Sequence, residues 1–212
     1  MKFASGGAAL TLDNTNWICN VDQYHNGSAN NLCIEFLSDS ATPSYSGSYY
    51  GLGMFMQDNG AQYYNITTAN NNGTRTEAFY PSGASRLNPY KNQVIYTQLT
   101  RLSTTSFKTE VFSNSGRTSS IGSSTLTINS AIQDLNQIGI WANGTGGNYY
   151  YTNVEIWNAT TSTSGSPDYE NDMTDATGWT QNGSTVNVNS AHANAAGATS
   201  TSAGDYVIRS LS

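Results

Sequence analysis

The densest group of side chains that could do chemistry is acidic and lies in the last quarter of the chain. It consists of Asp168, Glu170, Asp172 and Asp175. Carboxylates are ligands that Ca²⁺ prefers, but an EF-hand loop starting at Asp168 would need glycine at the position of Met173, which excludes that motif. Asp168, Glu170 and Asp172 remain candidates for a calcium site of another kind. A solvated edge is the favoured interpretation, and no cofactor is expected.

Two other glutamates, Glu110 and Glu155, each stand alone in a run of strand-forming residues. Glycoside hydrolysis needs a pair of carboxyl groups facing one sugar, held about 5–5.5 Å apart in retaining enzymes. His25 and His192 are far apart in the sequence, and no Ser-His-Asp arrangement can be assembled around them. We therefore expect no catalytic residues and predict that the chain is not an enzyme.

Aromatic side chains are a better indication of binding. Tyr and Trp combine a flat apolar face with a polar group, which suits stacking on sugars or contacts with other proteins. Successive side chains of a strand point to opposite faces, so a run of adjacent tyrosines places one ring in the core and another outside. The candidate ligand-binding residues are Tyr49, Tyr50, Tyr63, Tyr64, Tyr149 and Tyr151.

Cys19 and Cys33 are the two cysteines of the chain and lie symmetrically about Asn26 and Gly27, where a hairpin turn is predicted. On paired strands they could face each other and form a disulfide. Two half-buried thiols are the favoured interpretation, because buried cysteine commonly serves as a small hydrophobic residue. Neither cysteine has a neighbouring histidine, which argues against a zinc site.

The composition sets limits on the class of protein. Charged residues make up 10% of the 212 residues, against roughly 25% in an average globular protein. The hydrophobic content of 37% suffices for a core, and the net charge of -6 is too small to cause disorder. Only 8 Lys and Arg are present, which excludes the basic patch that nucleic-acid binding needs. Neither a signal peptide nor a membrane span is predicted.

Short runs of alternating apolar and polar residues, separated by Gly, Asn, Ser and Pro, predict an all-β chain. In the run 93–102, apolar residues occupy both faces, which is typical of a strand inside a two-layer sandwich. We expect one domain over 1–212, with a main body in 1–159, a Ser/Thr/Gly linker in 160–167, and strands in 168–212 that complete the sandwich on the same chain or on a neighbouring subunit. Strands are predicted at residues 17–24, 32–37, 50–57, 62–66, 93–102, 106–113, 124–128, 137–142, 149–157, 177–181, 184–189 and 205–211.

Four segments resemble the second half of concanavalin A-like (laminin G-like) jelly rolls. They are residues 93–101 (QVIYTQLTR), 106–116 (SFKTEVFSNSG), 135–143 (LNQIGIWAN) and 151–157 (YTNVEIW). The resemblance covers about two thirds of the chain. It implies a two-sheet antiparallel β-sandwich of the jelly-roll kind.

The order of the segments differs from that of the family. Residues 169–179 (YENDMTDATGW) and 184–189 (STVNVN) resemble its first strands, and residues 206–211 (YVIRSL) lead naturally into residues 10–17 (LTLDNTNW). We therefore predict a circular permutation, in which the linker joins what are ordinarily the two termini. Such a change is physically acceptable, because termini often lie close together at the surface.

Jelly rolls of this type occur in viral and microbial surface proteins, so the leading hypothesis is a non-enzymatic surface module, a structural or binding part of a virion decoration, fibre or adhesion protein. The alternatives are a soluble lectin or carbohydrate-binding module, and a subunit of an extracellular filament linked by donated strands. Expected partners are other copies of the chain, other surface or virion proteins, and glycans, with no nucleic acid and no membrane insertion. The expected location is a virion surface or the extracellular space.

Overall fold

The computed structural model describes residues 10–25, 31–40, 47–58, 63–80, 87–143, 149–171, 178–182, 187–188, 193–194 and 205–211. The strands are β1 (Trp17–His25), β2 (Asn31–Ser38), β3 (Tyr50–Asp58), β4 (Tyr63–Asn71), β5 (Thr74–Tyr80), β6 (Val94–Ser103), β7 (Ser106–Phe112), β8 (Ser120–Thr127), β9 (Gln137–Asn143), β10 (Tyr149–Asn158), β11 (Tyr169–Asn171), β12 (Thr180–Asn182), β13 (Asn187–Val188), β14 (Ala193–Asn194) and β15 (Asp205–Ser210). The one helical segment among these residues is the 3₁₀ turn η1 (Asn88–Tyr90), and none of them forms a helix long and apolar enough to cross a membrane.

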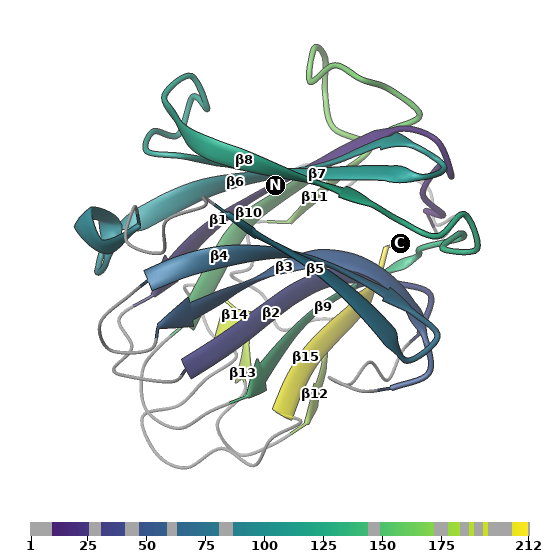
Figure 1. Cartoon of the computed structure of the whole chain (residues 1–212), viewed down its shortest axis with the longest axis horizontal. Helices are drawn as coiled ribbons and strands as arrows, with labels where there is room; N and C mark the ends of the chain where they lie inside the picture. The colour runs from purple at the N-terminus through teal and green to yellow at the C-terminus, as the bar shows by residue number, and fades with distance from the viewer. Residues whose placement is uncertain are drawn as a thin grey trace.

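Two antiparallel sheets face each other (Figure 1). Within the described residues, sheet A has eight strands in the order β13-β14-β10-β1-β6-β7-β8, with β11 also paired to β10. Sheet B has seven strands in the order β12-β15-β9-β2-β3-β4-β5. The prediction of an all-β, two-sheet antiparallel sandwich is confirmed.

Strand β6 shows how the alternating sequence pattern builds the layers. Its side chains alternate between buried and more exposed along most of its length. Ile95 and Leu99 point into the sandwich and are buried, whereas Val94 and Leu102 at its ends are exposed. The side of sheet A that carries Val94 therefore faces away from sheet B, and we call it the outer face.

The core lies between the two sheets. Trp17 of β1 and Phe107 of β7 are both fully buried, with ring centroids 5.9 Å apart and tilted ring planes, an arrangement that aromatic pairs favour. Arg101 is a buried cation beside them, only 1% exposed, and its guanidinium donates to the carbonyl oxygens of Ser103, Thr104 and Ile132. Burial lowers the pKa of Arg101, an effect that the charge of Asp13 partly opposes.

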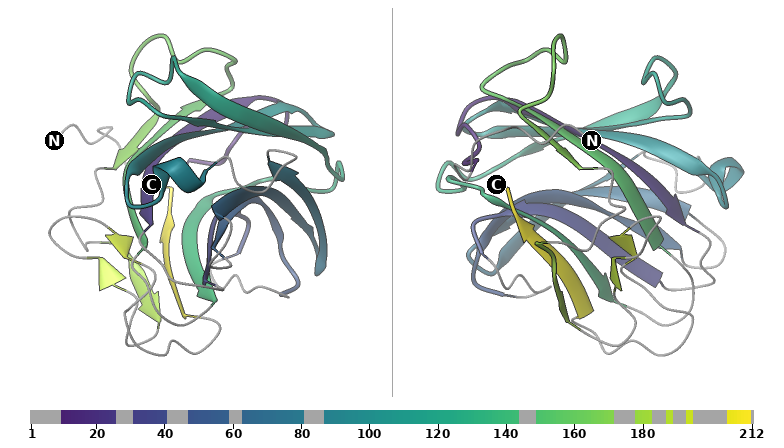
Figure 2. Two further views of the ribbon diagram at one scale, coloured as in Figure 1. Left: turned by 60° about the vertical axis from the view of Figure 1, so that its left-hand side comes forward. Right: turned by 180° about the vertical axis from the view of Figure 1, so that it is seen from behind.

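Strands that follow the linker pair with strands that precede it. In sheet B, β15 lies between β12 and β9, and in sheet A, β11 and β14 both pair with β10. The first and last described residues also meet, because the backbone N–H of Leu10 donates to the carbonyl oxygen of Leu211. Figure 2 shows β15 beside β9, far from it in sequence.

The predicted hairpin between the two cysteines does not form. Strand β1, with Cys19, pairs with β6 and β10 in sheet A, whereas β2, with Cys33, pairs with β3 and β9 in sheet B. The chain crosses between the layers after β1, so the two residues do not face each other on neighbouring strands. Cys19 is buried in the core. The side chain of Cys33 lies outside the described residues, so the favoured pair of half-buried thiols and the alternative disulfide both stay predictions.

Candidate functional site

A row of polar side chains crosses the outer face of sheet A. The strand registers place one residue from each of six strands directly opposite the next. Because directly opposed residues of antiparallel strands share a face, these side chains lie side by side. We call them the polar row, and its members in order are Glu170, Glu155, Asn20, Gln98, Glu110 and Ser123.

Hydrogen bonds connect the middle of the polar row. Gln98 Nε2 donates to Asn20 Oδ1 at 3.0 Å, and Asn20 Nδ2 donates to Glu155 Oε2 at 3.4 Å. Asn20 is only 5% exposed, so its amide has a fixed orientation between the two strands. The row therefore presents aligned amide and carboxylate groups instead of independent flexible side chains.

Glu110 lies next to Ser123 at the other end of the polar row. Lys108 Nζ donates to one carboxylate oxygen at 2.6 Å, and Ser120 Oγ donates to the other at 2.7 Å. Burial alone raises the pKa of Glu110, but these hydrogen bonds and the Lys108 charge outweigh it, so the pKa is lowered from its ordinary value. The carboxylate form of Glu110 is thus stabilised and already has its partners within the chain.

A β-bulge shapes the strand next to the polar row. The register between β1 and β10 shifts between Asn20 and Asp22, and Asn153 there has a φ of 51°. Bulges redirect side chains and are common beside functional sites. Here the bulge turns Asn153 toward β1, where its Nδ2 donates to Asp22 Oδ2 at 2.8 Å.

The loop between β7 and β8, residues 113–119, forms a wall above Asp22. Asn114 organises the loop, because its Oδ1 accepts hydrogen bonds from the backbone N–H groups of Thr118 and Ser119. Arg117 has a φ of 49° in this turn and reaches back over the sheet. Its Nη2 donates to Asp22 Oδ1 at 2.7 Å, and its guanidinium carbon lies 5.9 Å from the centre of the Tyr96 ring.

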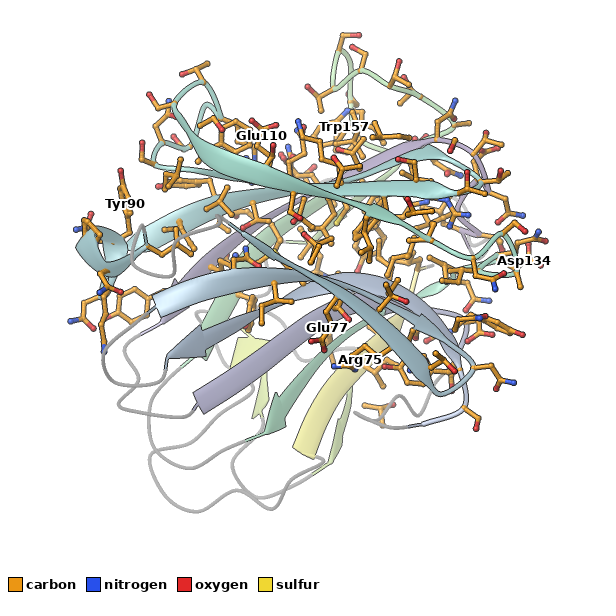
Figure 3. The ribbon with its side chains drawn as sticks, in the orientation of Figure 1. Arg75, Glu77, Tyr90, Glu110, Asp134 and Trp157 are labelled. Carbon is orange, nitrogen blue, oxygen red and sulfur yellow. The ribbon has the colours of Figure 1, made fainter. Side chains whose placement is uncertain are left out.

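Together the bulge, the loop and the start of the polar row line an open cavity of about 220 Å³. Its lining contains three carboxylates and one guanidinium, so its charge is net negative. Figure 3 shows Glu110 and Trp157 on the outer side of sheet A, the face on which the cavity opens. The lining residues are Asp22, Ser115, Arg117, Asn153, Glu155, Glu170 and Asn171.

The tyrosines proposed from the sequence lie elsewhere. Tyr151 is completely buried between the sheets and Tyr49 is 4% exposed, so both belong to the interior and not to an exposed binding face. Tyr50 is partly buried and packs against the core. Tyr63, Tyr64 and Tyr149 lie in β4 and β10, but their side chains are outside the described residues.

The acidic cluster is divided by the fold. Glu170 lines the cavity, whereas Asp168 accepts a hydrogen bond at 2.7 Å from the backbone N–H of Asn158. Asp172 and Asp175 lie outside the described residues, as does His192. Among the residues that the structure describes, no three His, Cys, Asp or Glu side chains form a group that could hold a metal ion.

Sequence reasoning missed Asp22, Arg117 and Asn153. They are far apart in sequence and meet only through the β1–β10 pairing and the fold of the 113–119 loop. Glu155 and Glu110 were considered singly, because their places in one row depend on the register of five strand pairs. The one local signal that could have pointed to Arg117 was the Asn114-Ser-Gly-Arg117 sequence, whose residue types favour a tight turn.

No family model matches the chain, and no curated protein matches it. Among solved structures, the chain is similar to the CBM2 module of the evolved Dit of Lactobacillus casei BL23 phage J-1, with 12% identity over 100% of this chain and 67% of that one and a TM-score of 0.36. It is also similar to scytalido-glutamic peptidase, solved with a transition-state analog inhibitor (7% identity, 95% of both chains, TM-score 0.43) and with a peptide-based analog (9%, 95% of both chains, 0.38).

The expectation that the chain is not an enzyme is corrected by this comparison. The similar structures include a peptidase as well as a phage module, and a fold by itself does not decide whether a protein is a catalyst. The expectation rested on the isolation of each glutamate in the sequence, whereas the fold brings Glu155 and Glu170 opposite each other.

Proposed function

We propose that this chain is a surface module that binds a glycan in the cavity on the outer face of sheet A. The observation that carries the proposal is the lining of that cavity, which is built from polar and charged side chains held by the hydrogen bonds of Asp22 and Asn153. Because these hydrogen bonds already fix the side chains of the cavity, little conformational entropy is lost when a ligand binds.

The chemistry of the lining suits a polyhydroxylated ligand. Hydroxyl groups donate to carboxylates and accept from amide and guanidinium N–H groups, so each sugar hydroxyl can use both kinds of neighbour. Glu155 and Glu170 supply acceptors, and Asn153, Asn171 and Arg117 supply donors within one cavity. Hydrogen bonds to charged groups contribute more than neutral ones, about 1.5–3 kcal/mol each.

The volume of the cavity suits a small polar ligand. Its volume of about 220 Å³ is below the roughly 300–1,000 Å³ of pockets for drug-sized ligands. A single sugar ring of a longer chain fits such a space better than a large apolar molecule. The polar row extends from the cavity toward β8 and offers further hydrogen-bonding groups to neighbouring sugars.

We place this module on a virion or another extracellular surface. The low content of charged residues, 10%, and the abundance of Ser, Thr, Asn and Gly support an exposed polar surface that does not attract polyanions. A role in a fibre or adhesion protein is compatible with glycan binding. The structure contains one chain, so the filament linked by donated strands stays a prediction.

The sandwich is, in this proposal, a circularly permuted jelly roll of the concanavalin A-like kind. The hydrogen bond from Leu10 to Leu211 supports the permutation, because it brings the first and last described residues together where the permuted order would continue. In this order the exposed segment 160–167 joins the two positions at which an unpermuted jelly roll would begin and end.

A glycan array tests the proposal. Purified protein should bind a subset of immobilised glycans saturably, and Glu170→Ala should weaken that binding about tenfold, as expected for the loss of one hydrogen bond to a charged group. Glu170 is exposed, so the substitution should leave the fold intact. Glu77→Ala is the matched control, because Glu77 lies on sheet B.

The outcomes separate clearly. Saturable binding that responds to Glu170→Ala and not to Glu77→Ala supports the cavity as the site. Binding that responds to neither variant, or silence across the array, contradicts the proposal.

A further inference from the structure

A tryptophan on the outer face lies hidden beside the cavity. Trp157 of β10 is only 7% exposed although it points away from sheet B (Figure 3). It stands two residues after Glu155, which lines the cavity, and side chains two apart on a strand share a face about 7 Å apart. Its neighbour across the strand pair is Ile18, also buried.

The linker, residues 160–167, contacts Trp157, and from here on we call it the strap. The indole Nε1 of Trp157 donates to the carbonyl oxygen of Gly165 at 3.2 Å. The strap forms the connection between β10 and β11. Asp168, the residue after the strap, fixes its end to β10, and we call this end the base. The N–H of Asp168 donates to Ile156 at 2.7 Å, and its carboxylate accepts from Asn158 at 2.7 Å.

The strap is weakly attached above this base. Apart from Pro167 it consists of Ser, Thr and Gly, and most of its residues are exposed. Its side-chain hydrogen bonds run within the strap itself, such as Ser162 Oγ to Ser164 Oγ at 2.9 Å. Lifting it breaks the hydrogen bond from Trp157 to Gly165, while the base at Asp168 keeps β10 and β11 paired.

We propose that Trp157 is a second, aromatic subsite of the glycan site, which becomes accessible when the strap lifts. The inference rests on the proposed function. Sugars stack their C–H faces on indole rings, and the cavity lies immediately along the strand, so one oligosaccharide can occupy both. The ligand class is an oligosaccharide of at least two units, with one unit in the cavity and the next on Trp157.

Gly165 offers a way to shift the strap without touching the core. Its φ of 96° lies in the left-handed region, and a Cβ added there would meet nothing within 4 Å. Gly165→Val therefore disfavours the covering conformation through backbone strain and not through a clash. Ser166→Val is the matched control, because it adds the same kind of side chain to the strap at a residue without positive φ.

The experiment measures affinity for cellohexaose, laminarihexaose and maltohexaose, together with the array hits, by calorimetry. The proposal expects Gly165→Val to bind several-fold more tightly than the wild type, because a larger fraction of molecules is already open. Ser166→Val should bind like the wild type. Trp157→Ala in the Gly165→Val background should weaken binding about tenfold or more, the loss expected for one stacked ring.

A second readout follows the ring directly. In protein labelled with 5-fluorotryptophan, the ¹⁹F resonance assigned through Trp157→Phe should shift on titration with the bound glycan. If glycans bind and respond to Glu170→Ala, but Gly165→Val leaves affinity unchanged or weaker and this resonance stays still, the aromatic subsite is refuted and the proposed function stands. If no glycan binds at all, both are refuted.

Discussion

Arg117 Nη2 lies 2.7 Å from Asp22 Oδ1, so one ion pair ties the β7–β8 loop to the strand that forms the floor of the cavity. Asp22 also accepts from Asn153 of the β10 bulge at 2.8 Å. A loop, a strand and a bulge from three parts of the sequence therefore converge on a single carboxylate. The shape of the candidate site depends on this junction.

The first prediction concerns that junction. Arg117→Ala leaves the Asp22 carboxylate, 6% exposed, without its cation, and uncompensated buried charge is strongly destabilising. We expect the free energy of unfolding to fall by about 2–3 kcal/mol in urea titrations. Ser115→Ala, in the same loop, should change it by less than about 0.5 kcal/mol. Equal effects of the two substitutions would show that the ion pair does not hold the loop.

Glu110 provides a prediction about pH. Its pKa in the folded chain is lowered below the ordinary value of 4.5, so its stabilising contribution is present above about pH 4.5 and is lost as pH falls through the folded pKa. The stability difference between wild type and Glu110→Gln should be largest near neutral pH and shrink in acid. Thermal melts from pH 7 to pH 3 measure it, and a difference that grows in acid would contradict the sign.

Arg101 gives the largest expected loss of stability. Its guanidinium donates to the carbonyl oxygens of Ser103, Thr104 and Ile132 at 2.8, 3.0 and 2.9 Å. Arg101→Met leaves these acceptors without that donor, and we expect a loss of about 3 kcal/mol or more in chemical denaturation. Leu102→Ala, at a neighbouring exposed position, is the control and should be nearly neutral. A small loss of stability in Arg101→Met would mean that water replaces the guanidinium as the hydrogen-bond donor.

Gly51 tests the packing of sheet B. A Cβ added there would lie 2.9 Å from Cε2 of Tyr49 and 3.2 Å from the carbonyl oxygen of Leu37. Gly51→Ala should destabilise the fold by about 1–3 kcal/mol through overpacking. Gly116→Ala, whose Cβ would meet only Asn114 at 3.6 Å, should be tolerated. Comparable melting temperatures for both variants would show that Tyr49 is not fixed against β3.

The permuted order of the strands can also be tested. Joining the chain ends with a short Gly/Ser linker and opening the chain within 160–167 should preserve cooperative unfolding, because Leu10 and Leu211 are already hydrogen-bonded and 160–167 is an exposed connection. Calorimetry of the permuted protein measures this. Loss of the cooperative transition would show that the connection through 160–167 is needed for the fold.

Much of the fold could be predicted from local sequence. The alternation in residues 93–102 identified β6, whose inner residues Ile95 and Leu99 are indeed buried. Strand β5 was missed because it forms the edge of sheet B and its first four residues, Thr74 to Glu77, include no apolar side chain. The pattern that reveals a strand is burial of one face, and an edge strand shows less of it.

The site could not be predicted in the same way. The register of five strand pairs decides that Glu170, Glu155 and Glu110 share one row, and register is a property of the paired sheet. Tyr151 was a candidate because it lies in a run of adjacent tyrosines, a pattern that does not say which ring faces outward, and it faces the interior. Asp22, Arg117 and Asn153 had no such local signal, and their place in the cavity became visible only when the loop and the bulge were placed.

The most direct test of the account is a titration followed by ¹H–¹⁵N spectra of side-chain amides, using the glycan that binds most strongly on the array. We expect the Asn153 and Asn171 amide resonances to shift saturably, because both line the cavity. The Asn70 amide on β4 of sheet B donates to Gly47 and should remain unchanged. Shifts at Asn70 with unmoved Asn153 and Asn171 resonances would contradict the account.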